Sequence, residues 1–369
     1  MVKDIISVKD LRVWFQVRRG FIESILSEEQ KYVKAVDGVT FTIKEREIFC
    51  LVGESGCGKT TTGKAILRLV EPTGGEVAYF GPGKEDMMKE MVEVALAKDE
   101  IDEDKAKRIM ERGGINVRAL NKKRMKSMRQ KLQIIFQDPY ESLNPKQSIY
   151  DIVAEPLVVN SIGANEAERE ERVTKALDDA GLRPPKNFMW RYPHEVSGGQ
   201  RQRVGVAGAL VLDPDFLVAD EPVSMLDVSI RSEILKLMLD LREKKGLSFL
   251  FITHDLGVAY VFSDRVAVMY LGKIVEMGPT EKVIKNPQHP YTKALISVVP
   301  TPDPNDREEK IILVGERPDP SDVPPGCRFH PRCPSVMDIC RLEEPKSVFV
   351  SPGHSVCCHL LIMQGAGKS

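Results

Sequence analysis

The sequence predicts an α/β fold built around a parallel sheet. Three short apolar runs are long enough for one buried strand each, at Ile48–Val52, Phe216–Ala219 and Ser248–Thr253. Helical patterns separate these runs, which is typical of a parallel sheet covered by helices. The first run leads directly into a glycine-rich loop, where we expect the chemistry to lie.

Composition limits the classes of function. The 369 residues suffice for two ordinary domains, and the 53 Lys and Arg nearly balance the 54 Asp and Glu, which argues against a nucleic-acid partner. No stretch approaches the roughly 18 consecutive apolar residues of a spanning helix, and the chain does not begin with a secretory signal. We therefore expect a cytoplasmic protein that works at a membrane only by docking onto another protein.

The first 50 residues predict a small antiparallel β subdomain. Residues 33–36 and 39–43 are rich in β-branched side chains and flank a turn at Asp37-Gly38. After the glycine-rich loop we expect a helix from Thr60 to about Leu69, because Pro72 and the glycines behind it end a helix.

Two further segments have a helical pattern. Residues 82–114 are highly charged, with apolar residues at helical spacing, and predict a surface insertion without chemistry. Helical patterns continue from Leu143 to Ala180, and another helix should begin near Ser197. We expect a nucleotide-binding domain over residues 1–270, with a helical subdomain over about 137–204, and a C-terminal extension over 271–369.

The glycine-rich loop fits the pattern G-x-x-x-x-G-K-[ST] between a strand and a helix, which predicts a P-loop NTPase core. Its backbone N–H groups and the helix N-terminus suit phosphate oxygens. Lys59 should reach the β- and γ-phosphates of ATP, and the Thr60 hydroxyl should bind Mg²⁺. The predicted nucleotide-binding residues of this P-loop are Gly53, Glu54, Ser55, Gly56, Cys57, Gly58, Lys59, Thr60 and Thr61.

The second apolar run ends in two acids. Asp220 can hold Mg²⁺ through water, and Glu221 can polarise an attacking water as a general base. Downstream of a P-loop, this pair predicts ATP hydrolysis.

The stretch from Val196 to Arg203, VSGGQRQR, resembles the signature sequence of ABC ATPases. That resemblance implies nucleotide contacts from Ser197, Gly198, Gly199 and Gln200. It also implies roles for Gln137 as the Q-loop glutamine that helps to bind Mg²⁺, for Asp227 in the D-loop and for His254 as the switch histidine. Phe15 lies where an aromatic residue of this family stacks on adenine, and Trp14 is the alternative.

A narrower resemblance is to the ATPases of dipeptide and oligopeptide importers. It is carried by residues 137–145 (QDPYESLNP), 192–195 (YPHE), 227–229 (DVS) and 286–292 (NPQHPYT). It implies a peripheral subunit at the cytoplasmic face of the membrane that powers peptide uptake. The implied partners are a second, related ATPase, two permease subunits and, indirectly, a solute-binding protein.

Other functions stay open at this stage. Related importers carry oligosaccharides or nickel. Proteins of other classes are a soluble ABC ATPase acting in DNA repair or translation, and a metal-dependent redox or regulatory protein.

Five of the seven cysteines lie in the last 43 residues. By the same resemblance, Cys327, Cys333, Cys340 and Cys358 correspond to four thiolates that can hold a [4Fe–4S] cluster, since soft ligands select such metals. The spacing lacks the C-x-x-C pairs of ordinary zinc sites. Zinc, free thiols and a disulfide stay as alternatives. His330, His354 and His359 are expected at the surface, unless one of them replaces a thiolate.

Overall fold

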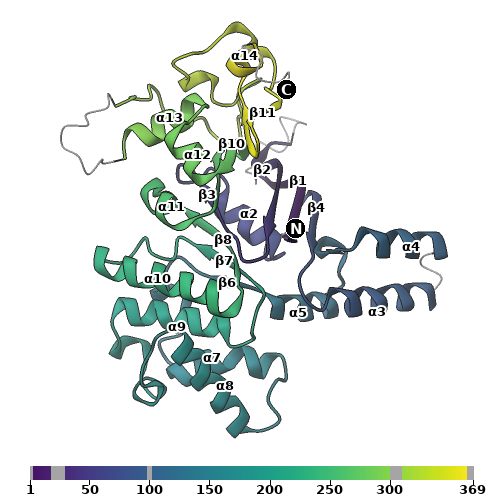
Figure 1. Ribbon diagram of the computed structural model, residues 1–369, viewed down its shortest axis with the longest axis vertical. Helices are drawn as coiled ribbons and strands as arrows, with labels where there is room; N and C mark the ends of the chain where they lie inside the picture. Colours follow the sequence, from purple (N-terminus) through teal and green to yellow (C-terminus); the bar gives the residue numbers. More distant parts are fainter. Residues whose placement is uncertain (1–2, 18–29, 98–101, 300–309, 364–369) are drawn as a thin grey trace, which may run out of the picture. The chain divides into compact units, whose positions relative to one another are not determined.

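The structure is a computed structural model that describes residues 3–17, 30–97, 102–299 and 310–363 (Figure 1). The chain forms two compact units. The first consists of Met1–Ser7, Thr42–Ile48 and Val77–Ile252, and the second of Val8–Phe41, Phe49–Glu76 and Thr253–Ser369. Several strands have residues in both units, among them β1 (Asp4–Gln16), β2 (Tyr32–Lys44) and β4 (Gly74–Tyr79).

The first unit contains a parallel sheet made of the predicted apolar runs. Strand β7 (Phe216–Asp220) pairs in parallel with β6 (Leu132–Ile135) on one side and with β8 (Ser248–Thr253) on the other. All residues of β7 and β8 are buried, which explains why their sequences are apolar throughout instead of alternating.

Helices α7 (Ile149–Val159), α8 (Glu166–Asp179) and α9 (Gly198–Leu210) pack on one another in this unit (Figure 1). The helical pattern over 143–180 is therefore two helices, because Gly163 adopts a φ of 90° between them. The unit also contains helices α6 (Pro139–Ser142) and α10 (Val228–Lys245), with short 3-10 turns at Val117–Ala119, Pro185–Asn187 and Pro193–Glu195.

The charged insertion is helical. Helix α3 (Lys84–Ala97) lies beside α4 (Glu103–Arg112) and is followed by β5 (Ile115–Asn116) and α5 (Lys122–Lys131) (Figure 1). Strand β5 pairs antiparallel with β4, so the two ends of this helical segment lie next to each other.

The second unit contains β3 (Ile48–Val52), which pairs in parallel with β9 (Arg265–Tyr270). Strand β9 then pairs antiparallel with β10 (Lys273–Pro279). The cysteine-bearing segment continues this sheet, because β12 (His354–Cys357) pairs with β10 and β11 (Ser347–Ser351) pairs with β12. Strand β1 lies between β2 and β4 in a second sheet.

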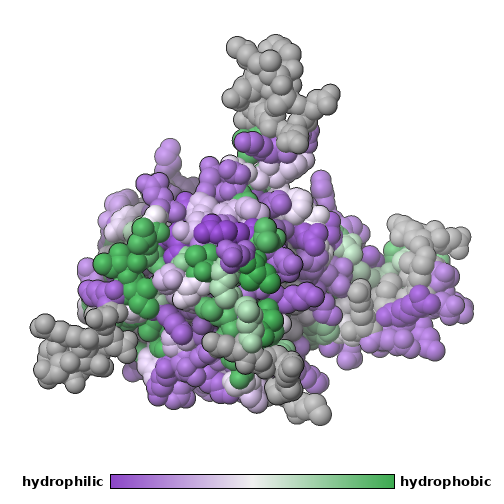
Figure 2. All heavy atoms as spheres, turned by 90° about the horizontal axis from the view of Figure 1, so that it is seen from above, coloured by the Kyte–Doolittle hydropathy of each residue, from purple (hydrophilic) through white to green (hydrophobic). Residues whose placement is uncertain are grey.

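The helices described in the second unit are α2 (Lys59–Ile66), α11 (Leu256–Phe262), α12 (Thr280–Lys285), α13 (Pro290–Ser297), α14 (Asp338–Leu342) and α15 (His359–Met363), with a 3-10 turn at His330–Arg332. Helix α2 ends earlier than the sequence predicts, at Ile66. Apolar side chains gather in several patches among charged ones on the face seen in Figure 2. Within the described ranges, every helix is too short or too polar to cross a bilayer.

Candidate functional site

Glycine is required at two positions of the P-loop. Gly53 and Gly58 have φ values of 150° and 108°, which side-chain-bearing residues rarely adopt. A Cβ atom on Gly53 would lie 2.2 Å from the carbonyl oxygen of Met269, and one on Gly58 would lie 2.1 Å from that of Ala35. The loop can therefore curl tightly only because these positions have no side chain.

Lys59 lies inside the curve of the P-loop. Its side chain is 4% exposed, and its Nζ donates to the carbonyl oxygens of Gly53 at 2.8 Å and Glu54 at 3.0 Å. Thr60 and Thr61 follow in the first turn of α2, where backbone N–H groups and the helix dipole favour an anion. The cation, the loop and the helix end together form an arrangement suited to phosphate.

Cys57 packs in the same loop. Burial raises the pKa of its thiol, and the nearby Lys59 ammonium lowers it only in part. A neutral, buried thiol is a poor nucleophile, so Cys57 fills space in the loop.

Gln137 and Glu221 meet in the first unit. The Gln137 amide Nε2 donates to Oε2 of Glu221 at 3.1 Å. Gln137 lies two residues beyond the end of β6, and Glu221 directly follows β7, so the pairing of these two strands brings the side chains together. Asp220, the last residue of β7, is 4% exposed.

The backbone of Glu221 is held in an uncommon conformation. Its φ is 46°, its N–H donates to the Ile252 carbonyl at 2.9 Å, and its own carbonyl accepts from the Ser224 hydroxyl at 3.0 Å. Residues in the left-handed region cluster at functional sites, where surrounding contacts keep them in place. These contacts fix the direction in which the carboxylate leaves the strand.

The signature sequence builds the start of α9. Ser197 is the N-cap residue: its Oγ accepts from the Gln200 N–H at 3.3 Å, while the Gln200 Oε1 accepts from the Ser197 N–H at 3.0 Å. This reciprocal pair is a capping box. Gly198 and Gly199 then open the helix, so small residues and N–H groups lie at its N-terminus.

Three other predicted residues occupy the ends or edges of elements. Asp227 precedes α10 as its N-cap residue, and its carbonyl accepts from the Arg231 N–H at 2.9 Å. His254 is exposed directly after β8. Phe15 is 44% exposed on β1, whereas the neighbouring Trp14 donates to the Asp37 carboxylate at 3.1 Å.

The predicted residues are divided between the two units. Phe15, residues 53–61 of the P-loop and His254 belong to the second unit, and Gln137, residues 197–200, Asp220, Glu221 and Asp227 belong to the first. The structure brings together Gln137 with Glu221 and Lys59 with the P-loop carbonyls. The roles assigned to all of these residues stay predictions.

Sequence reasoning missed the residues through which the C-terminal part of the chain contacts the second residue of the P-loop. Arg332 forms an ion pair with Glu54, and the Tyr291 hydroxyl accepts from the Glu54 N–H at 3.0 Å. Tyr291 lies in the segment 286–292, which carries part of the resemblance to peptide importers, but nothing in the sequence pairs it with residue 54.

The cysteine segment contains free thiols, not disulfides: all seven cysteines of the chain are unpaired. Burial, together with the neighbouring thiols of Cys340, Cys358 and Cys333, raises the pKa of Cys327 to about 12. The four thiols are thus close enough to interact. Yet among the residues that the structure describes, no three His, Cys, Asp or Glu side chains are placed to hold a metal ion. The [4Fe–4S] assignment therefore has no support from this arrangement.

Two of the three C-terminal histidines are not at the surface, contrary to the sequence prediction. His354 is 3% exposed, with its Nε2 2.8 Å from the buried Glu276 carboxylate. His359 is also buried, with its Nε2 2.9 Å from the Glu343 carbonyl. Each is buried because a polar partner satisfies its ring.

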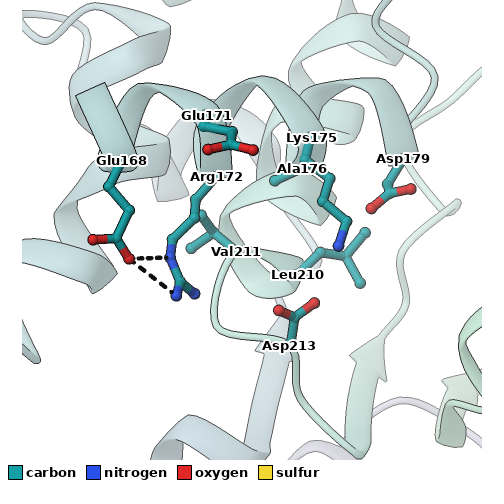
Figure 3. A pocket seen from close by; sticks show the side chains of 9 residues that line it. All are labelled: Glu168, Glu171, Arg172, Lys175, Ala176, Asp179, Leu210, Val211 and Asp213. Carbon is teal, nitrogen blue, oxygen red and sulfur yellow. Dashed lines mark hydrogen bonds and ion pairs between the residues drawn. The ribbon is translucent and has the colours of Figure 1, made fainter. Parts of the chain in front are cut away.

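A separate pocket of about 300 Å³ lies between α8 and the end of α9 (Figure 3). Its lining is mostly charged, with Arg172 paired to Glu168 at 3.3 Å, and Lys245 binds two of its acids, Asp179 and Asp213, at 2.7 and 3.8 Å. None of the predicted nucleotide residues lines it. Ion pairs therefore compensate part of the charge of this pocket.

Comparison with protein families gives two matches. The family described as "ABC transporter" matches residues 36–224, and the family described as "Oligopeptide/dipeptide transporter, C-terminal region" matches residues 275–340. The first match includes the P-loop, the signature and both acids, and the second ends at Cys340.

Similar proteins cover nearly the whole chain. The oligopeptide transport ATP-binding protein AppF of Bacillus subtilis is 40% identical over 96% of this chain and 97% of its own length. The dipeptide transport ATP-binding protein DppF of Haemophilus influenzae is 42% identical over 94% of each.

Two solved structures are similar to this chain in fold. A dimeric, post-hydrolysis ATP-binding cassette, MJ0796 bound to ADP and Pi, has a TM-score of 0.56 and 27% identity over 75% of this chain and 99% of its own. A second dimeric structure of the same cassette also has a TM-score of 0.56, at 28% identity, with the same coverage.

Proposed function

Because this chain belongs to the ATP-binding subunits of oligopeptide and dipeptide ABC transporters, we propose that it powers the uptake of di- and oligopeptides through partner permeases. The chain has the ATP-binding cassette fold and is an ATP-hydrolysing transporter subunit. The observation that carries the peptide assignment is the joint match to the cassette and to the peptide-transporter C-terminal region.

The predicted site residues have distinct roles in this proposal. Lys59 and the P-loop N–H groups bind the β- and γ-phosphates of ATP. Thr60, Gln137 and Asp220 would hold Mg²⁺, which neutralises phosphate charge when bound. Glu221 takes a proton from the attacking water, and Gln137 orients its carboxylate through the 3.1 Å hydrogen bond.

We propose that two such ATPases act as a pair, in which residues 197–200 of one chain contact ATP on the P-loop of the other. The two dimeric structures of the similar cassette MJ0796 support the pairing of two ATPases. The second ATPase is proposed to be a related chain. Both would dock on two permeases at the cytoplasmic face of the membrane, with a solute-binding protein delivering the peptide. ATP binding and hydrolysis then shift the pair between closed and open states.

Uptake of a labelled tripeptide by cells that carry the chain and its permease subunits tests this proposal. Lys59→Ala should abolish uptake, whereas Lys64→Ala, on the same helix outside the motif, should leave it unchanged. Uptake of nickel or an oligosaccharide in place of peptide would overturn the assignment of peptides as the transported substrate. ATP hydrolysis stimulated by DNA or ribosomes, and not by the permeases, would overturn the transport role.

We further propose that Cys327, Cys333, Cys340 and Cys358 bind a [4Fe–4S] cluster. The number of these thiols and the softness of sulfur as a ligand support this, and binding would require the thiols to rearrange locally. Iron and acid-labile sulfide should be found at about four atoms each per chain after anaerobic purification. Stoichiometric zinc, or four titratable thiols without metal, would contradict the proposal.

A further inference from the structure

Glu54, the second residue of the P-loop, is held by the C-terminal segment, which we define as residues 271–369. Arg332 binds the Glu54 carboxylate through two hydrogen bonds, from Nη1 to Oε2 at 2.9 Å and from Nη2 to Oε1 at 3.1 Å. The Arg332 side chain is only 10% exposed. The paired fork of a guanidinium on a carboxylate fixes both groups in direction as well as in charge.

The same segment of chain also holds the backbone of Glu54. Its N–H donates to the hydroxyl of Tyr291, a residue 237 positions later. The Tyr291 ring is buried and packs against Tyr270 at 4.8 Å and Phe329 at 5.3 Å between ring centroids. Phe329 lies three residues before Arg332, so one buried aromatic cluster anchors both contacts to Glu54.

A third contact occurs at the tip of the loop. A Cβ atom on Gly56 would lie 2.9 Å from Nη1 of Arg317, so this exposed guanidinium rests directly on the glycine. The C-terminal segment thus places two arginines against a loop whose own charged side chains are Glu54 and Lys59.

The charges explain what Arg332 does. Without a partner, the Glu54 carboxylate would add a negative charge to the loop that must accept a triphosphate. We propose that Arg332 is a positioning residue for nucleotide binding: it neutralises and orients Glu54, so that the C-terminal segment forms part of the ATP site. This inference rests on the proposed function only in that the P-loop binds ATP.

A double-mutant cycle on the full-length chain tests it, with the Kd for ATP measured by calorimetry in EDTA so that no hydrolysis occurs. Arg332→Met should raise the Kd about tenfold or more, because it leaves the carboxylate unpaired beside the phosphates. Glu54→Gln should change the Kd by about twofold at most, and the double variant should bind like Glu54→Gln. A double variant as weak as Arg332→Met would overturn the proposal, since the effect would then not depend on Glu54.

Lys273→Met is the matched control. Lys273 also ties down part of the C-terminal segment, through an ion pair with Glu344 at 2.6 Å, and neither residue belongs to the P-loop. Its Kd should equal that of the parent. If Arg332→Met does not fold, Arg332→Lys takes its place with an expected rise of about threefold, and an unchanged Kd overturns the inference. A parent chain that fails to bind ATP would instead overturn the proposed function.

Discussion

Single glycines decide whether the P-loop can form. Gly58→Ala would place a Cβ atom 2.1 Å from the Ala35 carbonyl at a φ of 108°. We expect it to lower the free energy of unfolding by about 2 kcal/mol and to abolish ATP binding. Gly205→Ala is the control, because Gly205 lies in α9 with nothing within 4 Å of the added methyl group and should gain about 0.5–1 kcal/mol. Equal denaturation midpoints for the two variants would contradict this.

A buried histidine gives the chain a pH dependence. Burial lowers the pKa of His289 to about 4, against about 6.5 when unfolded, and its Nδ1 accepts from the Tyr291 N–H at 3.1 Å. Between these values the unfolded chain binds the proton and the native chain does not, so stability falls as the pH falls from 6.5 to 4. Over this pH range the free energy of unfolding should fall by about 3 kcal/mol.

His289→Asn keeps an acceptor at this position but does not titrate. Denaturant unfolding at pH 7 and pH 4.5 should show a smaller loss of stability for this variant than for the parent. Identical pH profiles would show that His289 is not responsible.

At the residue scale, motifs predicted the residues that carry the chemistry but not the distant residues that hold them in place. Lys59, Asp220 and Glu221 are recognisable because their roles require local neighbours: a glycine loop or the end of an apolar strand. Arg332 was missed because its partner, Glu54, lies 278 positions away, and an arginine in a proline-rich segment has no local signal. The buried His354 was misjudged for the same reason, since Glu276 supplies its partner from another strand.

At the scale of elements, capping places the signature. The Ser197–Gln200 capping box fixes where α9 begins, and thus where its glycines lie. Ser197→Ala should cost about 1 kcal/mol of stability and reduce ATP hydrolysis about tenfold or more, because the hydroxyl is also proposed to contact phosphate.

Ser148→Ala separates these two effects. Ser148 and Asp151 form the same kind of capping box on α7, outside the predicted nucleotide residues. This variant should lose a similar free energy of unfolding and keep its ATPase rate. If Ser197→Ala retains full activity in the assembled transporter, the signature residues do not contact nucleotide as proposed.

The elements themselves were predictable where their signal is local. Runs of buried apolar residues correctly gave β3, β7 and β8, and helical periodicity gave the charged insertion. The strands β11 and β12 were missed, because they are short and β12 pairs with β10 some 78 residues away. Non-local pairing leaves little trace in a single sequence.

At the scale of the whole molecule, the predicted nucleotide residues are shared between two units that are interleaved along the chain. The order of the motifs along the sequence, and not composition, indicated one cassette. The membrane partners could be inferred only through resemblance, because the cassette is identified by its nucleotide motifs and these do not encode the cargo.

The rate of ATP hydrolysis by the Glu221→Gln chain, assembled with its partner ATPase, tests the central claim most directly. If Glu221 is the general base, the rate should fall at least about 100-fold while ATP stays bound in a stable dimer. A variant that hydrolyses ATP at the parent rate would contradict the account.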